Sequence, residues 1–157
     1  MSGFRRGVRL GIDVGTARVG VARCDRDGLL AVPVETVPRN EASIRRIADL
    51  ATEYEAFELL VGLPVSLSGG ETASTEDARD FAAELAATTG APVRLVDERL
   101  STVTAHAAMR DAGRSQKSSR RIIDQVAAVV LLQHAIDVEK STGTPAGALL
   151  PGSQESP

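Results

Sequence analysis

Three acidic residues stand where a carboxylate is unusual, and together they could bind divalent cations. Asp13 ends the apolar stretch VRLGID, Glu98 closes the stretch VRLVDE, and Asp124 lies inside the helical pattern IIDQVAA. Carboxylates rarely occupy such apolar neighbourhoods unless they are paired or bind a cation. We therefore treat Asp13, Glu98 and Asp124 as candidate catalytic and metal-binding residues.

Three carboxylates of this kind support metal-assisted hydrolysis of a phosphodiester. Two divalent cations can bridge a phosphodiester, one activating water and the other stabilising the leaving oxygen. Hard ions such as Mg²⁺ and Mn²⁺ prefer oxygen ligands, and water and phosphate complete their coordination, so few protein ligands are needed. The predicted cofactor is therefore Mg²⁺ or Mn²⁺, in a two-metal site.

Each acid also has a simpler interpretation. Asp13 precedes Gly-Thr and could be only a turn residue. Asp97 and Glu98 point to opposite sides of a strand, so only one of them should face the cluster. Either one could instead pair with Arg99 or cap the following helix. These alternatives explain the acids singly but not their combination.

Asp124 follows a stretch that is rich in basic residues. It could pair with Arg120 or Arg121, which lie one helical turn before it. The basic residues of the stretch are Arg110, Arg114, Lys117, Arg120 and Arg121, against the single acid Asp111. Such a run is commonly a solvated charged surface, but beside a phosphodiesterase site it favours contact with phosphates.

The composition is that of a single globular domain. The chain has 157 residues, of which 43% are apolar and 25% charged, with a formal net charge of −3. This charge argues against bulk adhesion to nucleic acid but permits a local basic patch. With three Phe, one Tyr and no Trp, the chain is poorly equipped to read single strands by stacking, so contact with the backbone fits better.

Cysteine content and hydropathy bear on the compartment. Cys24 is the only cysteine, which excludes an internal disulfide and a multi-cysteine zinc site. No apolar run approaches the roughly 18 residues of a membrane span. No apolar segment of a secretory signal follows Arg5 and Arg6. We expect a cytoplasmic protein that does not associate with membranes.

Strands and helices in the order βββαβαβαα must position the acids. Strands are predicted near 8–14, 19–24, 29–37, 57–61 and 93–96. Two helices are predicted to begin at 40 and at 74, a third to span 101–113, and a last, long helix to end at about 140. Ser74 and Asp77 predict a capping box for the second helix. The order indicates an α/β domain with a mixed five-stranded sheet flanked by helices. We expect a flexible N-terminus at 1–7, the domain at 8–140 and a disordered tail at 141–157.

The predicted elements can pack closely around the acids. Gly11 lies on the same face of its strand as Asp13 and leaves room there for another element. Asp124 shares a helix face with Ala128 and Leu131, and Ala128 is small enough to let the helix approach the sheet. Two strand ends and one helix could therefore bring the three acids together.

Four motifs resemble those of the YqgF/RuvX family, described as Holliday-junction-resolvase-like proteins and pre-16S rRNA nucleases. They are GIDVGTARVGVA, GLP, DERLST and DQVAA, and in this order they extend over about residues 8–140. The resemblance implies an RNase H-like fold and metal-dependent cleavage of structured nucleic acid. It also implies Asp13, Glu98 and Asp124 as the ligand set, with Glu98 preferred over Asp97. Residues implied to contact the substrate backbone are Thr16, Arg18, Arg99, Arg114, Lys117, Arg120 and Arg121.

The implied reaction is in-line attack of metal-activated water on a phosphodiester, which leaves a 3′-hydroxyl and a 5′-phosphate. The implied substrates are pre-16S rRNA, processed at its 5′ end, and branched DNA such as a Holliday junction. Both would be recognised through shape and backbone. The protein would act as a monomer or a homodimer.

Two other functions are compatible with the sequence. A non-catalytic nucleic-acid-binding or transcription-associated factor could keep the same fold, although three intact acids speak against it. The segment DVGT also resembles the first phosphate loop of actin, Hsp70 and sugar kinases. Those proteins clamp a nucleotide between two domains, and this chain has room for one.

Overall fold

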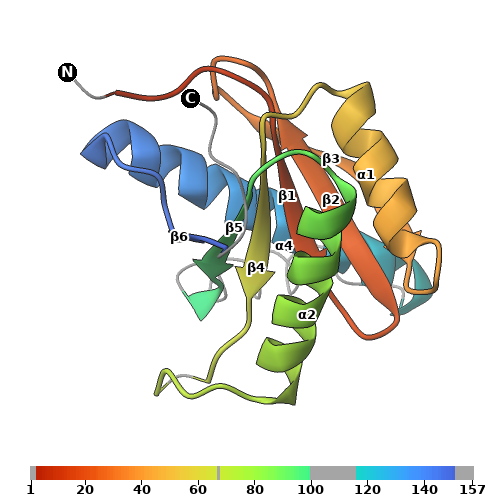
Figure 1. The fold of residues 1–157 in the computed structure, drawn as a ribbon. Helices are drawn as coiled ribbons and strands as arrows, with labels where there is room; N and C mark the ends of the chain where they lie inside the picture. Colours follow the sequence, from red (N-terminus) through yellow and green to blue (C-terminus); the bar gives the residue numbers. More distant parts are fainter. Residues whose placement is uncertain (1–2, 67, 100–115, 151–157) are drawn as a thin grey trace.

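The protein is built from one mixed sheet with helices on both faces (Figure 1). The structure is a computed structural model that describes residues 3–66, 68–99 and 116–150, with side chains in the last range from residue 125 onward. The helix predicted over 101–113 falls outside the described residues. In the part of the chain that is described, no helix is long and apolar enough to span a membrane.

The sheet has six strands in the order β3-β2-β1-β4-β5-β6. The strands are β1 Arg9–Val14, β2 Arg18–Cys24, β3 Ala31–Pro38, β4 Glu58–Leu63, β5 Val93–Asp97 and β6 Ala148–Leu149. Strands β1, β2 and β3 form an antiparallel meander, whereas β1, β4 and β5 run parallel. The carboxyl ends of β1, β4 and β5 therefore lie at one edge of the sheet. The predicted mixed sheet is confirmed, with β6 as an additional strand.

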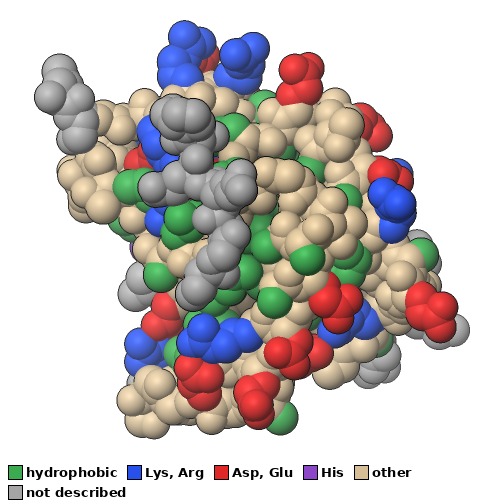
Figure 2. All heavy atoms as spheres, in the orientation of Figure 1, with side chains coloured by type: hydrophobic (Ala, Val, Ile, Leu, Met, Phe, Trp, Pro, Cys, Tyr) green, Lys and Arg blue, Asp and Glu red, His purple; other side chains and the backbone are tan. Residues whose placement is uncertain are grey.

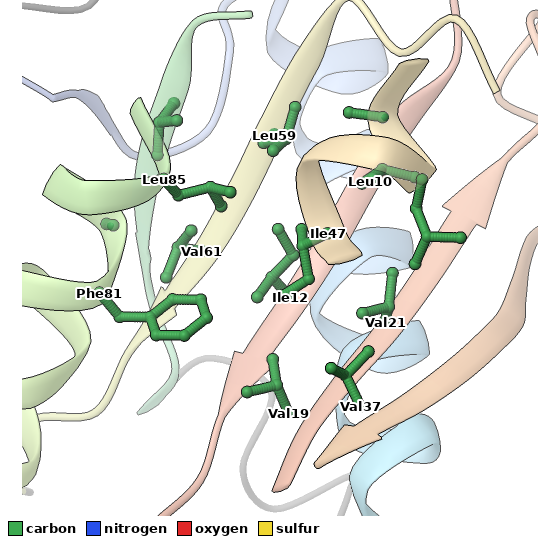
Figure 3. Packing of buried hydrophobic residues seen from close by; sticks show 14 of the residues in the cluster. Leu10, Ile12, Val19, Val21, Val37, Ile47, Leu59, Val61, Phe81 and Leu85 are labelled. Carbon is green, nitrogen blue, oxygen red and sulfur yellow. The ribbon is translucent and has the colours of Figure 1, made fainter. Parts of the chain in front are cut away.

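Two helical layers enclose the sheet. Helices α1 (Ser43–Glu53) and α2 (Ala73–Thr88) cover one face, and α4 (Gln116–Thr142) covers the other. Under α1 and α2, Phe81 of α2 points toward Ile12 of β1 and Val19 of β2 (Figure 3). The core on the opposite face joins Leu60 of β4 to Leu132 of α4 and their buried neighbours. Successive strand residues thus serve opposite cores, as the predicted alternation requires.

Helix α2 begins with a capping box, but its residues are not the predicted ones. The backbone N–H of Thr75 donates to the hydroxyl of Thr72, and the N–H of Thr72 donates to Thr75 Oγ1 at 2.9 Å. Thr75 Oγ1 also donates to the carbonyl of Pro64 at the end of β4. The prediction of Ser74 and Asp77 was wrong because Thr-x-x-Thr lacks the acidic residue that marks the motif. Asp77 is consequently left to pair with another element.

The N-terminal segment, predicted to be flexible over residues 1–7, is anchored from Arg5 onward. The Arg5 side chain donates to Glu139 of α4 at 2.9 Å and to Glu58 of β4 at 3.0 Å. Its guanidinium also lies 5.1 Å from the centre of the Phe57 ring. The local sequence could not reveal this, because the partners lie far away along the chain.

A disordered tail was predicted for residues 141–157, and the structure differs from it over 141–150, whereas 151–157 lie outside the described residues. Strand β6 pairs antiparallel with β5, and the N–H of Leu150 donates to the carbonyl of Val93 at 2.8 Å. The Pro, Gly and Ser content of the segment indicated a tail, but two residues are enough to pair with the exposed edge of β5.

Candidate active site

Asp13 lies at the carboxyl end of β1, on the face covered by α4. Its neighbour Ile12 belongs to the core under α1 and α2, so strand alternation directs Asp13 and Gly11 to the opposite face. A Cβ atom at Gly11 would lie 2.8 Å from Leu132 Cβ and 2.9 Å from the Ala128 carbonyl oxygen. The glycine therefore allows the close approach of α4 that the sequence predicted.

Glu98 follows β5 directly, and its side chain lies over Gly62 of β4. A Cβ atom at Gly62 would come 2.8 Å from Glu98 Cγ and 2.9 Å from Cδ. Because β4 separates β5 from β1, a side chain that crosses Gly62 reaches toward Asp13. The carboxyl groups of Glu98 and Asp13 meet there in a hydrogen bond.

The electrostatics of this pair suit a hard cation. Burial raises the pKa of Glu98 well above its ordinary value, and the hydrogen bond and charge of Asp13 raise it further, with a smaller contribution from Asp97. Two carboxyl groups that are hydrogen-bonded to each other share a proton unless a cation is present. A divalent cation can replace that proton, so the donor set fits Mg²⁺ or Mn²⁺.

Asp97, the alternative to Glu98, is engaged elsewhere. Its Oδ1 accepts from the backbone N–H of Arg99 at 2.8 Å, and its Oδ2 pairs with Arg99 Nη2 at 2.6 Å. This pair lowers the pKa of Asp97, chiefly through the Arg99 hydrogen bond. The geometry brings Glu98, and not Asp97, into contact with Asp13.

The third acid, Asp124, lies in α4, one turn before Ala128, which packs on the sheet. Its side chain is outside the part of the chain that the structure describes, so its contact with the other acids stays a prediction. The next residue, Gln125, contacts the sheet, because its Nε2 donates to Thr36 Oγ1 of β3 at 2.8 Å. Within the side chains that are described, no cluster of three metal-ligating residues forms.

The predicted substrate contacts divide into two groups. Thr16 is exposed in the β1–β2 connection, Arg18 is half-buried as the first residue of β2, and Arg99 is exposed next to Glu98. Arg99 Nη1 would lie 3.3 Å from a Cβ atom at Gly69, so its side chain extends over the loop after β4. The remaining four fall on the segment where side chains are not described: Arg114, Lys117, Arg120 and Arg121.

The face that carries α1 and α2 shows acidic and basic side chains beside one another (Figure 2). Several of them form ion pairs, such as Arg46 with Glu35 at 2.6 Å and Arg79 with Glu71 at 2.6 Å. Opposite charges at this spacing offset each other for a polyanion. This face is therefore a poor platform for nucleic acid compared with the carboxyl edge of β1, β4 and β5.

The roles of Gly62 and Gln125 were not predicted from the sequence. Both belong to short motifs, GLP and DQVAA, so the motifs indicated these positions but not what they contact. The roles depend on contacts with Glu98 and Thr36, which come from other strands. Local periodicity does not contain that information.

The strand order and the layers define the class of RNase H-like α/β proteins, as predicted. The solved structures "T. thermophilus RuvC in complex with Holliday junction substrate" and "Thermus thermophilus RuvC structure" share this fold with TM-scores of 0.56 and 0.54 and identities of 17% and 16%. The alignments cover 88% and 91% of this chain and 98% and 99% of those chains.

The chain belongs to the RuvX family, whose model is described as "Holliday junction resolvase" and matches residues 7–138. Its relatives include three bacterial proteins, each named "Putative pre-16S rRNA nuclease". The protein of Clavibacter michiganensis subsp. michiganensis is 55% identical over 98% of both chains. That of Leifsonia xyli subsp. xyli is 57% identical over 92% of this chain and 94% of its own. That of Streptomyces coelicolor is 52% identical over 92% and 88%.

Proposed function

We propose that this protein is a metal-dependent nuclease that hydrolyses phosphodiester bonds in structured nucleic acid, with Asp13, Glu98 and Asp124 as its metal ligands. The observation that carries the proposal is the meeting of Asp13 and Glu98 on the α4 face of the sheet. Two acids from different strands converge there beside the helix that holds Asp124. Membership of the RuvX family supports the same reaction class.

The chain's own residues bind and orient the substrate in this mechanism. Asp13 and Glu98 would hold the cations through their carboxylate oxygens once their shared proton has passed to solvent. Mg²⁺ or Mn²⁺, when bound, would activate water for in-line attack and stabilise the departing 3′-oxygen. Thr16 and Arg18 hold the phosphate backbone beside the acids. The apolar layer between the sheet and α4 keeps bulk water from the inner side of Asp13 and Glu98. The electrostatic attraction between these carboxylates and a cation is therefore stronger than it would be in water.

We favour precursor 16S rRNA as the substrate, because the full-length relatives at 52–57% identity carry that name. The family description points instead to a four-way DNA junction. Both substrates are structured nucleic acids that expose a phosphate backbone. Recognition through backbone and shape serves either of them.

The test is cleavage of a precursor 16S rRNA fragment and a four-way DNA junction side by side, with Mg²⁺, Mn²⁺ or EDTA. We expect wild type to cut at least one substrate only when metal is present. Asp13→Asn and Glu98→Gln should each lower the single-turnover rate by about 100-fold or more, because each removes an anionic ligand. The products should carry a 5′-phosphate.

Asp97→Asn is the matched control, since it changes the adjacent acid and retains an oxygen for the Arg99 N–H. Its rate should stay within about threefold of wild type, because Asp97 is the smallest of the influences on Glu98. The proposal fails if wild type cuts neither substrate with metal, or if Asp13→Asn cuts as fast as wild type. Loss of activity in Asp97→Asn with full activity in Glu98→Gln would assign the ligand to Asp97.

A further inference from the structure

The connection between β1 and β2 is a tight turn that stands directly beside Asp13. The N–H of Gly15 donates to the carbonyl of Arg18 at 2.9 Å, and Thr16 and Ala17 are exposed at its tip. Asp13 itself is held inside the sheet, where it is paired with Gly20 of β2. The turn thus carries two proposed substrate contacts, Thr16 at its exposed tip and the half-buried Arg18 where β2 begins.

Arg39, which follows β3, binds this turn with both its backbone and its side chain. Its N–H donates to the carbonyl of Ala17 at 2.9 Å. Its Nη1 donates to the carbonyl of Gly15 at 2.9 Å and to Asp77 Oδ2 at 2.9 Å, while Nη2 donates to Asp77 Oδ1 at 2.8 Å. One residue therefore joins the turn to the first part of α2.

The guanidinium of Arg39 is itself held in place. It lies 4.9 Å from the centre of the Phe81 ring, and that ring is anchored in the core between α2 and the sheet. The Asp77 hydrogen bond raises the pKa of Arg39, and the same bond lowers the pKa of Asp77. Both groups therefore stay charged over the neutral range. The fork geometry of arginine allows simultaneous bonds to a carboxylate and a carbonyl.

We propose that Arg39, oriented by Asp77, is a positioning residue that holds the Gly15–Arg18 turn so that Thr16 and Arg18 meet the substrate backbone. The inference rests on the proposed nuclease function. Asp13 does not depend on this device, because its place is fixed by β1 and β2. Loss of Arg39 should consequently weaken substrate binding and leave the chemical step nearly unchanged.

The experiment compares Arg39→Ala with Arg46→Ala. Arg46 makes a comparable fork with Glu35 between α1 and β3, at 2.6 and 2.9 Å, and does not touch the turn. We expect Arg39→Ala to raise KM, and the Kd measured in an Asp13→Asn background, by about 5- to 20-fold, as for the loss of one or two backbone contacts. The kcat should change by less than about threefold. Arg46→Ala should leave both values at the wild-type level.

A double-mutant cycle separates positioning from direct contact. If Arg39 acts through the turn, Arg39→Ala should add less than about twofold to the loss of binding caused by Arg18→Ala. If the two losses multiply, Arg39 contacts the substrate independently, and the positioning role is wrong. Arg39→Lys should recover only part of the affinity, since an ammonium group lacks the fork.

The outcomes also distinguish this inference from the proposed function. Wild type that neither binds nor cuts nucleic acid overturns both. Wild type that binds and cuts, together with an Arg39→Ala variant of unchanged KM, overturns the role of Arg39 alone. A loss of kcat at unchanged KM, or an equal loss in Arg46→Ala, overturns it as well, because the effect would then come from Asp13 or from the fold.

Discussion

Replacement of Gly62 by alanine should separate catalysis from stability in this protein. Glu98 reaches Asp13 by crossing β4 at the one position where that strand has no side chain. The added methyl group would lie 2.8 Å from Glu98 Cγ and 2.9 Å from Cδ. Ordinary contact begins at 3.4 Å, so Glu98 Cγ and Cδ must retreat by about 0.5 to 0.6 Å or rotate away, and the carboxyl oxygen Oε1, which lies closer still, must move further.

The expected cost falls on the reaction rate. Metal ligands must stay within about 0.5 Å of their productive positions, and displacements approaching 1 Å cost up to about 100-fold. We therefore expect Gly62→Ala to lower the single-turnover cleavage rate by about 10- to 100-fold. The free energy of unfolding should change by less than about 1 kcal/mol, because the end of a flexible side chain can move without repacking the core. Cleavage assays and urea unfolding on the same preparation measure both quantities.

Gly90→Ala is the matched control, because a Cβ atom at Gly90 would have no neighbour within 4 Å. Its rate and its unfolding free energy should both match wild type. A wild-type rate in Gly62→Ala would refute the placement of Glu98 over β4 as the catalytic arrangement. A large loss of stability would instead show that Gly62 serves packing.

Two further predictions concern stability. Gly11→Ala should lower the free energy of unfolding by about 1 to 3 kcal/mol in urea melts, because the new methyl group would lie 2.9 Å from the rigid Ala128 carbonyl. The second concerns pH: burial alone would raise the pKa of Glu139, but the Arg5 hydrogen bonds outweigh it and lower the pKa from 4.5 to about 2. The stabilisation from this carboxylate is therefore complete above pH 4.5 and lost as the pH falls toward 2. The stability gap between wild type and Glu139→Gln should narrow over that interval, and a constant gap would contradict the assignment.

Sequence patterns were sufficient to predict which face of a strand each residue occupies. The alternation in β1 predicted that Gly11 and Asp13 share a face, and the close approach of α4 at Gly11 bears this out. The same alternation at the end of β5 predicted that only one of Asp97 and Glu98 faces the cluster. Only the contacts of Arg99 and Asp13 decide which one, because a strand end can turn either way.

Roles that depend on distant partners could not be predicted. Glu139 of α4 binds Arg5 and Arg9, which lie 134 and 130 residues before it. Glu58 of β4 binds Arg94 of β5 at 3.1 Å in the same buried group. Buried charges are stable only when paired, but neither partner is visible in a local window. The N-terminal segment was therefore predicted to be flexible, although the buried ion pairs of Arg5 hold it in place.

The glycines around Asp13 explain why the acids can meet on this face of the sheet. Gly11 precedes Asp13 by two residues, and Gly20 of β2 is paired with Asp13. On β4, Gly62 follows Val61, the partner of Ile12, and therefore lies beside Asp13. Each neighbouring position on the α4 face therefore lacks a side chain. Gly11 admits the helix that holds the third acid, and Gly62 admits Glu98. A larger residue at Gly11 would meet α4, and one at Gly62 would meet Glu98, so either change would displace a part of the proposed site. The proposed site thus depends on its glycines as much as on its carboxylates.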